Sequence, residues 1–281
     1  MHSSTVGIYH DVNDRSADET EEGAEHWYAH AVNFVVVTSR VRAGSTIRLD
    51  DHPDEYCVVL PTGAISVTVT TGGEEVLAHE ESLVVVPPGD SRIEATQDGF
   101  VHRVLSKKSP LHARGRGDGP VHAQADLVAD LVPWPDPVGG FRLRHYPLTD
   151  FEHLEGKQRI FRTTNMMIKL APAKDSRRSP RELSPHSHAD FEQASLVVHG
   201  EWIHHMRLPW KADSTQWLDD EHHRIGAPSV TVIPPTVIHT SQSIGEHLNQ
   251  LIDIFAPPRV DFSLAGRVTN EDDYPLPEGL R

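Results

Sequence analysis

A recurring pattern of short β-branched runs constrains this chain more than any other feature. In the first half, five such runs are separated by Gly, Pro and Asp and span residues 33–39, 55–60, 64–70, 82–86 and 101–105. Further runs span 141–146, 163–171, 193–198, 201–208, 230–233 and 250–255. Runs of this length and composition, bounded by turn residues, are typical of β-strands. The sequence therefore predicts an all-β fold.

An internal repeat divides these runs into two sets. The segment VVVPPG at 84–89 matches TVIPPT at 231–236, which indicates two copies of one unit. The 281 residues suffice for two cores of roughly 100 residues each. We expect two β-barrels in the order of an N-terminal extension (1–27), a first barrel (28–108), a Gly- and Pro-rich linker (109–140), a second barrel (141–258) and an extended C-terminal tail (259–281).

Charge and cysteine content narrow the partners and the compartment. Lysine and arginine total 26 against 41 aspartates and glutamates, a formal charge of −15, which disfavours nucleic acid and anionic membranes. Cys57 is the only cysteine, so no intrachain disulfide forms, as is usual in the cytoplasm. The N-terminus shows no signal-peptide pattern, and the apolar runs are far shorter than the roughly 18 residues of a membrane span. We expect a cytoplasmic protein with no nucleic-acid or membrane partner.

Three histidines form the most specific chemical pattern. His186 and His188 are separated by one residue, and residues i and i+2 of an extended strand point to the same face. His239 follows the second Pro-Pro pair. Glu192 and Gln193 lie between these motifs and compete for one further inward position, because neighbours on a strand face opposite ways. The pattern predicts a site for a divalent metal in the second half of the chain.

These motifs resemble those of the cupin superfamily. The first cupin motif is His-x-His, a short spacer, a carboxylate or amide, six residues and Gly, and residues 186–200 fit it. The second is Pro-x-Gly-x-x-His, and residues 234–239 fit it except that Thr236 replaces the glycine. The resemblance implies two jelly-roll barrels in tandem and a metal held by His186, His188 and His239. Counting back from Gly200 favours Gln193 as a weak fourth ligand or substrate contact, with Glu192 as the alternative.

The ligand types bear on the metal and the reaction. Imidazole-rich, thiolate-free ligation suits Fe(II), Mn(II), Zn(II), Ni(II) and Cu(II), of which we favour Fe(II). Because an amide ligand leaves more positive charge at the metal than a carboxylate, we expect a small anionic or chelating organic substrate. Three histidine ligands would leave facing positions open for a substrate and O2, so a mononuclear dioxygenase is the leading expectation. The first alternative is a metal-dependent isomerase or lyase in which His204, His205 or Glu192 moves a proton, and the second is a non-catalytic module that binds a small molecule.

The first barrel lacks most of the metal motif. It has one histidine, His52, in its first motif region, and Arg92 stands where the last ligand histidine belongs. A guanidinium does not lose its proton to bind a metal, so we expect this barrel to be metal-free. His52, Glu55 and Arg92 remain candidates for binding a small polar ligand. Exposed sheet edges, which need protection, further suggest a homodimer.

Overall fold

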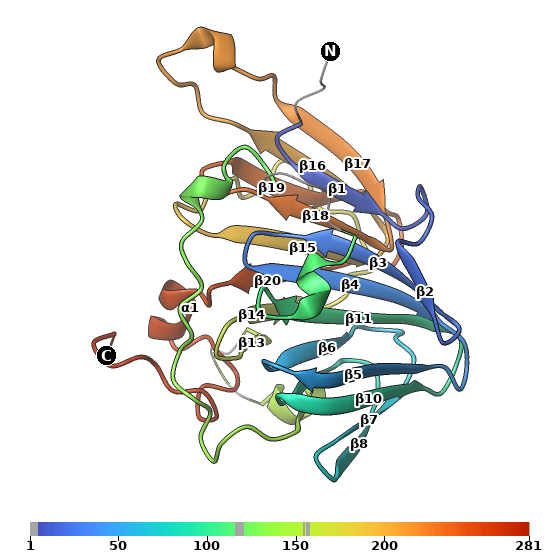
Figure 1. Ribbon diagram of the computed structural model, residues 1–281. Helices are drawn as coiled ribbons and strands as arrows, with labels where there is room; N and C mark the ends of the chain where they lie inside the picture. The colour runs from blue at the N-terminus through green and yellow to red at the C-terminus, as the bar shows by residue number, and fades with distance from the viewer. Residues whose placement is uncertain (1–4, 116–120, 154, 156–157, 281) are drawn as a thin grey trace.

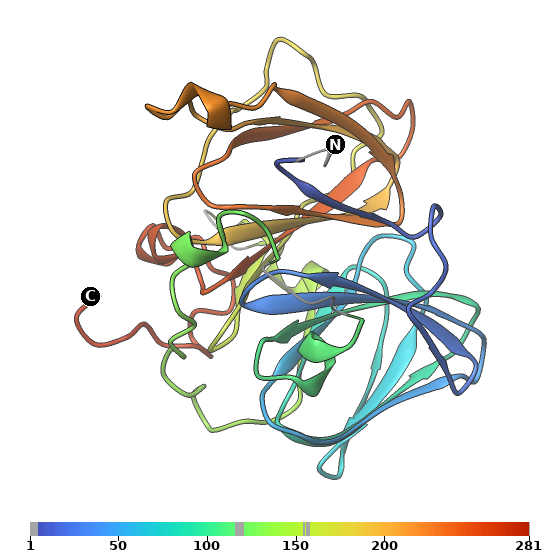
Figure 2. The same ribbon diagram turned by 45° about the horizontal axis from the view of Figure 1, so that its top comes forward.

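The predicted all-β fold is confirmed by a computed structural model, which describes residues 5–115, 121–153, 155 and 158–280. The described residues form twenty β-strands, four short 3-10 helices and one α-helix, α1 (Val260–Leu264). The strands are arranged in two barrels that lie side by side, as Figures 1 and 2 show from two directions. No helix of the described residues is long and apolar enough to cross a membrane.

The N-terminal barrel consists of two sheets. Its large sheet has seven strands in the order β12 (Arg144–Pro147), β9 (Ser82–Val86), β6 (Tyr56–Leu60), β11 (Gly99–Ser106), β4 (Phe34–Val41), β3 (Ala24–His30) and β2 (Glu19–Glu21). Its small sheet has four strands in the order β5 (Thr46–His52), β10 (Gly89–Ala95), β7 (Val67–Thr71) and β8 (Glu74–Ala78).

The C-terminal barrel repeats this plan. Its large sheet has the order β1 (Ile8–Asp11), β18 (Ser229–Ile233), β15 (Glu192–His199), β20 (Gln250–Ala256), β14 (Met167–Leu170) and β13 (Ile160–Arg162). Its small sheet has the order β17 (Glu221–Gly226), β16 (Glu201–Arg207) and β19 (Ile238–Ser243), and an isolated bridge joins His186 to His239. Position by position, β1-β18-β15-β20-β14-β13 corresponds to β12-β9-β6-β11-β4-β3.

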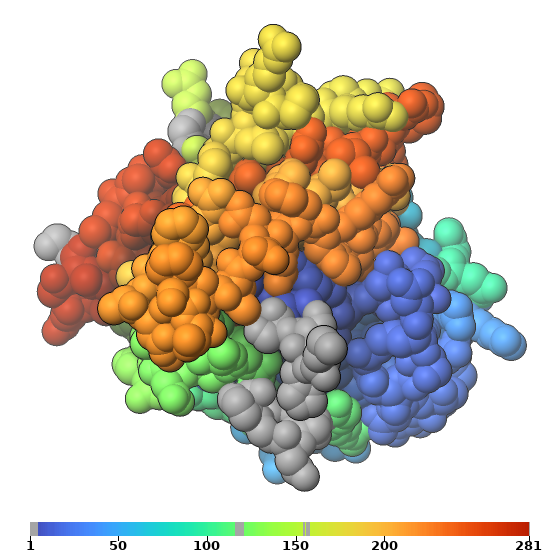
Figure 3. Space-filling view, turned by 90° about the horizontal axis from the view of Figure 1, so that it is seen from above, coloured from blue at the N-terminus to red at the C-terminus, as the bar shows by residue number. Residues whose placement is uncertain are grey.

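The two barrels exchange edge strands. β1 lies in the segment expected as an N-terminal extension, yet it pairs with β18 of the C-terminal barrel, with Ile8 opposite Val232. β12 lies in the segment expected as part of the C-terminal barrel, yet it pairs with β9, with Arg144 opposite Val85. Seen from above, the blue N-terminal residues lie against the orange residues of the C-terminal barrel (Figure 3). Each exchange covers a sheet edge whose backbone groups would otherwise be unpaired.

The large sheets of the two barrels pack against each other. One apolar cluster contains Val59 of β6 and Val85 of β9 together with Leu196 of β15 and Ile254 of β20, all of them buried. Because side chains alternate across a strand, the neighbours of these residues face the interiors of the two barrels. The sheet-to-sheet contact is therefore the largest shared core, and it fixes how the barrels sit.

The linker and the tail complete the chain. The linker contains η1 (Pro110–Ala113) and η2 (Ala125–Leu127), while η3 (Leu148–Phe151) and η4 (Ser214–Gln216) lie within the C-terminal half; the Gly-rich part of the linker, 116–120, lies outside the described residues. The tail, expected to be extended, instead contains α1 and buries Tyr274, which is 1% exposed. The Tyr274 hydroxyl donates a hydrogen bond to Glu55 Oε2 of the N-terminal barrel at 2.9 Å. The tail thus ties the two halves together.

Candidate metal centre

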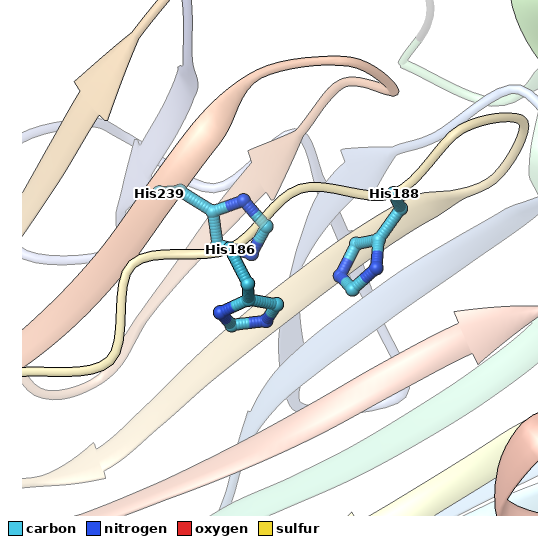
Figure 4. Close-up of side chains that lie close together, drawn as sticks. All are labelled: His186, His188 and His239. Atoms are coloured by element: carbon cyan, nitrogen blue, oxygen red, sulfur yellow. The ribbon is translucent and has the colours of Figure 1, made fainter.

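The structure brings His186, His188 and His239 together. One nitrogen of each lies within 4.8 Å of the others, and in the part of the chain that the structure describes no other group of three His, Cys, Asp or Glu is this compact. His186 and His188 come from one extended segment and His239 from β19, and Figure 4 shows the three rings around a common space. The bridge between His186 and His239, with backbone N···O distances of 3.1 and 2.8 Å, holds the two segments together.

Backbone carbonyls orient two of the three rings. His186 Nδ1 lies 2.9 Å from Ser184 O, and His239 Nδ1 lies 2.9 Å from Val237 O. A carbonyl only accepts hydrogen bonds, so each Nδ1 carries the proton and each Nε2 presents its lone pair. This is the arrangement by which metal-binding histidines are usually held.

Burial keeps the two inner histidines neutral. It lowers the pKa of His188 to about 3 and that of His239 to about 4, and the mutual repulsion of the histidines adds to this effect. His188 also stacks on Phe191, with ring centroids 4.4 Å apart. Neutral imidazole is the form that binds metals.

Gln193 points into the same space. Its Oε1 lies 3.1 Å from His188 Nε2 and 3.4 Å from His239 Nε2. Because His239 Nε2 presents a lone pair, two acceptors face each other there, and a cation shared by both would relieve the repulsion. Two ligand atoms each about 2.1 Å from one ion lie about 3.0–3.4 Å apart at octahedral to tetrahedral angles. The observed spacings fit a bound divalent metal.

A carboxylate behind Gln193, which sequence reasoning missed, completes the site. Gln193 Nε2 donates to Asp253 Oδ1 at 2.9 Å, which fixes the amide so that its oxygen faces the histidines. Asp253 Oδ2 lies 3.6 Å from Lys169 Nζ. Burial raises the pKa of Asp253, while Lys169 opposes that rise. The available signal was a single acidic residue within the apolar run of β20.

Glu192 lies on the opposite side of β15 and is removed from the site. It is fully buried, and its carboxylate accepts hydrogen bonds from Val32 N, at 2.8 Å to Oε2, and from His122 Nε2, at 2.8 Å to Oε1. Strand alternation turns Glu192 toward the N-terminal barrel when Gln193 faces the metal centre. Both the expected catalytic role of Glu192 and its alternative role as a ligand are therefore corrected.

His204 lies inside the C-terminal barrel but is not poised for proton transfer. It sits on β16 opposite Ser241 of β19, whose hydroxyl lies 2.9 Å from His204 Nδ1. His204 Nε2 is buried and has no hydrogen-bond partner. Burial lowers the pKa of His204 to about 3, so the ring is neutral near pH 7.

The residue that departs from the cupin pattern adopts a glycine-like conformation. Thr236 has φ = +67° in the turn before His239, a region that β-branched residues rarely adopt. Its N–H donates to His188 O at 2.6 Å, which links the two ligand segments. In the first barrel, Gly89 occupies the corresponding place with φ = +110°.

The first barrel does not gather the three residues proposed for a polar ligand. His52 is bound to Asp54 O and Ser109 Oγ, and Glu55 accepts hydrogen bonds from Thr164 and Tyr274 at the contact between the barrels. Arg92 is exposed and pairs with Glu94 at 2.7 Å. The register of β10 shifts between residues 89 and 91, so Ser91 rather than Arg92 faces the interior.

Comparisons with known proteins agree with this architecture. No protein-family model matches the sequence, and no curated protein matches it. Among solved structures, a variant of oxalate decarboxylase from Bacillus subtilis has 15% identity and a TM-score of 0.56, covering 91% of this chain and 78% of that one. The formate complex of oxalate decarboxylase from Lactobacillus farciminis has 15% identity and a TM-score of 0.55, covering 96% and 93%.

A cupin 2 conserved barrel domain protein from Leptotrichia buccalis has 11% identity and a TM-score of 0.50, covering 90% of this chain and 98% of that one. These similarities establish the fold class predicted from the histidine motifs: two cupin barrels in tandem. More narrowly, the chain has a bicupin fold, and its second barrel holds a histidine cluster that could bind a metal.

Proposed function

We propose that this chain is a mononuclear metal-dependent enzyme that acts on a small anionic, chelating substrate in the C-terminal barrel. The observation that carries the proposal is the convergence of His186, His188 and His239 with the amide of Gln193, itself held by Asp253. When bound, the metal would supply Lewis-acid or redox chemistry. His186, His188 and His239 would hold it, with Gln193 as a weaker ligand or a contact to the substrate.

Charges around the centre favour an anionic substrate. Three imidazoles and an amide are neutral, so they leave the charge of a divalent metal uncompensated. The guanidinium of Arg259 lies 5.6 Å from the centroid of the Phe191 ring, which packs on His188. Its charge helps to lower the pKa of His188 and of His239. The formate complex of the Lactobacillus farciminis oxalate decarboxylase is consistent with a small carboxylate in such a barrel.

The position of the proton-transfer candidates favours a dioxygenase over an isomerase or lyase. Isomerases and lyases need a side chain that moves a proton at the substrate. Glu192 faces the other barrel, and His204, bound to Ser241, is a weak base because burial lowers its pKa to about 3. A dioxygenase needs no such side chain, because the bound metal would supply the redox chemistry. We favour Fe(II) for this reason, and Mn(II), present in the solved oxalate decarboxylase of Bacillus subtilis, is the first alternative.

The test combines metal analysis with oxygen uptake. Protein purified without oxygen and reconstituted with Fe(II), Mn(II) or Zn(II) would be analysed by inductively coupled plasma mass spectrometry. We expect about one equivalent of metal in the wild type, and its loss in His188→Ala and His239→Ala. The control His205→Ala removes a histidine of β16 that lies outside the cluster, and it should keep the metal.

Oxygen consumption with a panel of small carboxylates then separates the functions. Uptake that requires Fe(II) and both histidines supports the dioxygenase. Turnover under argon by the metal-loaded protein would replace it with an isomerase or lyase. A protein that takes up no metal after reconstitution would overturn the proposal and leave a non-catalytic binding barrel.

A further inference from the structure

A second cavity lies in the N-terminal barrel. Its volume is about 330 Å³, and it opens between β3, β5 and η1. Ile47, Leu49 and Leu111 form apolar parts of its wall, while His26 and Arg103 supply polar groups. The cavity belongs to the barrel whose metal motif is missing, and the proposed reaction does not use it.

Arg103 is an unusual residue for a barrel interior. It stands on β11 between Val101 and Leu105, which face the same apolar core, and it is only 2% exposed. Its Nη2 donates a long hydrogen bond to Ser39 Oγ at 3.4 Å, and its Nε has no partner. Among the described residues, Arg103 has no ion pair. A buried guanidinium stays charged and normally has an anionic partner.

The other cations at the cavity already have acidic partners. At its exposed rim, Arg48 lies 3.3 Å from Glu22, and Arg114 lies 3.0 Å from Glu19. Burial and the charge of Arg103 lower the pKa of His26 to about 4, so that ring is neutral near pH 7. Arg103 is therefore the one interior cation of this cavity without a counter-charge.

The place of Arg103 corresponds to that of Asp253 in the other barrel. Arg103 pairs with Val58 of β6, and Asp253 pairs with Ser195 of β15. Val58 lies five residues before Gly63, and Ser195 lies five residues before Gly200. Both side chains thus emerge at one position of the repeated barrel. In the C-terminal barrel that position supports the metal centre.

We propose that the N-terminal barrel is a second ligand site, which binds a small organic monocarboxylate. Its carboxylate would pair with the Arg103 guanidinium, and its apolar body would lie between Ile47, Leu49 and Leu111. One uncompensated interior charge matches a monoanion. Glu21, Glu22 and Asp50 at the rim disfavour a dianion such as inorganic phosphate.

Isothermal titration calorimetry with benzoate, acetate and inorganic phosphate tests this site. Wild-type protein should bind benzoate at one equivalent per chain, more tightly than acetate, with no saturable binding of phosphate. Arg103→Met should weaken benzoate binding at least tenfold. Arg103→Lys keeps the charge but loses the planar fork, and it should weaken binding by less. Arg92→Met, which removes an exposed arginine of β10, should bind as the wild type does.

Two further results distinguish this site from the metal centre and from a structural role. His239→Ala should bind benzoate like the wild type, because its substitution lies in the other barrel. Without ligand, Arg103→Met should melt no lower than the wild type, since it removes a buried, unpaired charge. If Arg103→Met does not fold, binding by Arg103→Lys that equals the wild type would overturn the proposal. The proposal would also be overturned if the wild type did not bind benzoate or preferred phosphate. It would be overturned equally if folded Arg103→Met bound benzoate as tightly as the wild type.

Discussion

The two barrels share one strand order but fill their interiors differently. In the N-terminal barrel both faces of β6 are apolar, because Val58 faces the interior and Val59 faces the other barrel. In the C-terminal barrel the corresponding strand, β15, is apolar where Ala194 and Leu196 face the other barrel, while Gln193 and Ser195 place polar groups in the interior ahead of Val197. A barrel wall can therefore be stabilised from one side and leave its other side free for chemistry.

The same contrast holds at single positions. Gln193, which faces the histidines, corresponds to Tyr56, whose hydroxyl lies 2.9 Å from Ser91 Oγ and closes the interior. Asp253 corresponds to Arg103, so the sign of the interior charge is reversed. We infer that sequence divergence after the repeat changed the ligand of each barrel while the shared sheet contact preserved the fold.

The largest expected effect concerns metal binding by the two barrels. His188→Ala should weaken metal binding at least 100-fold, whereas His52→Ala, in the first motif of the other barrel, should keep the wild-type stoichiometry. Metal at 100 times its dissociation constant stabilises a folded protein by about 2.7 kcal/mol. Thermal unfolding with and without Mn(II) measures this gain, which should vanish only in His188→Ala. An equal loss of stabilisation by Mn(II) in both variants would contradict the expectation that only the C-terminal barrel binds metal.

The next effect concerns His102, the neighbour of Arg103 that faces the other barrel. Burial lowers the pKa of His102 to about 4, against about 6.5 in an unfolded chain. Between these values the unfolded chain binds more protons, so folding stability is full above pH 6.5 and falls as the pH drops. The shifted pKa of His102 alone should lower the free energy of unfolding by about 2 kcal/mol between pH 7 and pH 5. Denaturant unfolding at pH 7 and pH 5 should show a smaller loss for His102→Gln than for the wild type.

A smaller effect concerns a pair of corresponding glutamates. Glu55 of the N-terminal barrel accepts hydrogen bonds from Thr164 N and from Tyr274 of the other half, and Glu192 of the C-terminal barrel accepts them from Val32 N and His122. Replacing either with Gln puts an amide donor against these donors and should lower the free energy of unfolding by about 1.5 kcal/mol. Urea unfolding measures both variants. A loss of stability in only one variant would show that Glu55 and Glu192 do not contribute equally to the contact between the two halves.

The smallest effect concerns the turn before the last ligand. Thr236→Gly should stabilise the protein by up to about 1 kcal/mol, because glycine adopts positive φ without the steric cost that threonine bears. The reciprocal change, Gly89→Thr, should destabilise it by about 1 kcal/mol. Thermal unfolding of the two variants tests the pair, and a loss of stability in Thr236→Gly would show that its side chain makes a compensating contact.

Much of the architecture could be predicted from the sequence because strand periodicity and turn residues are local signals. The two-barrel fold followed from the repeat, and the grouping of His186 with His188 followed from their spacing on an extended segment. His239 joined them through the resemblance to the second cupin motif. The strand exchange could not be predicted, since the pattern of β1 identifies a strand but not its partner. The choice between Glu192 and Gln193 required knowing which face of β15 meets the other barrel.

Arg103 was missed for a different reason. The run 101–105 predicts a strand, and in a strand residue 103 faces the same side as Val101 and Leu105. A charged residue in phase with two buried apolar residues is itself a signal. Arg92 attracted attention because of its place in a motif, although a bulge turns it to solvent.

The exchange of β1 and β12 has the form of a domain-swapped homodimer whose subunits have been joined into one polypeptide. Each half lends its leading strand to the other. A break in the linker would therefore yield two fragments that are each incomplete at one edge and complementary to one another. Such a chain completes both barrels only as a whole. Its two candidate ligand sites therefore stay on one polypeptide even though their chemistry differs.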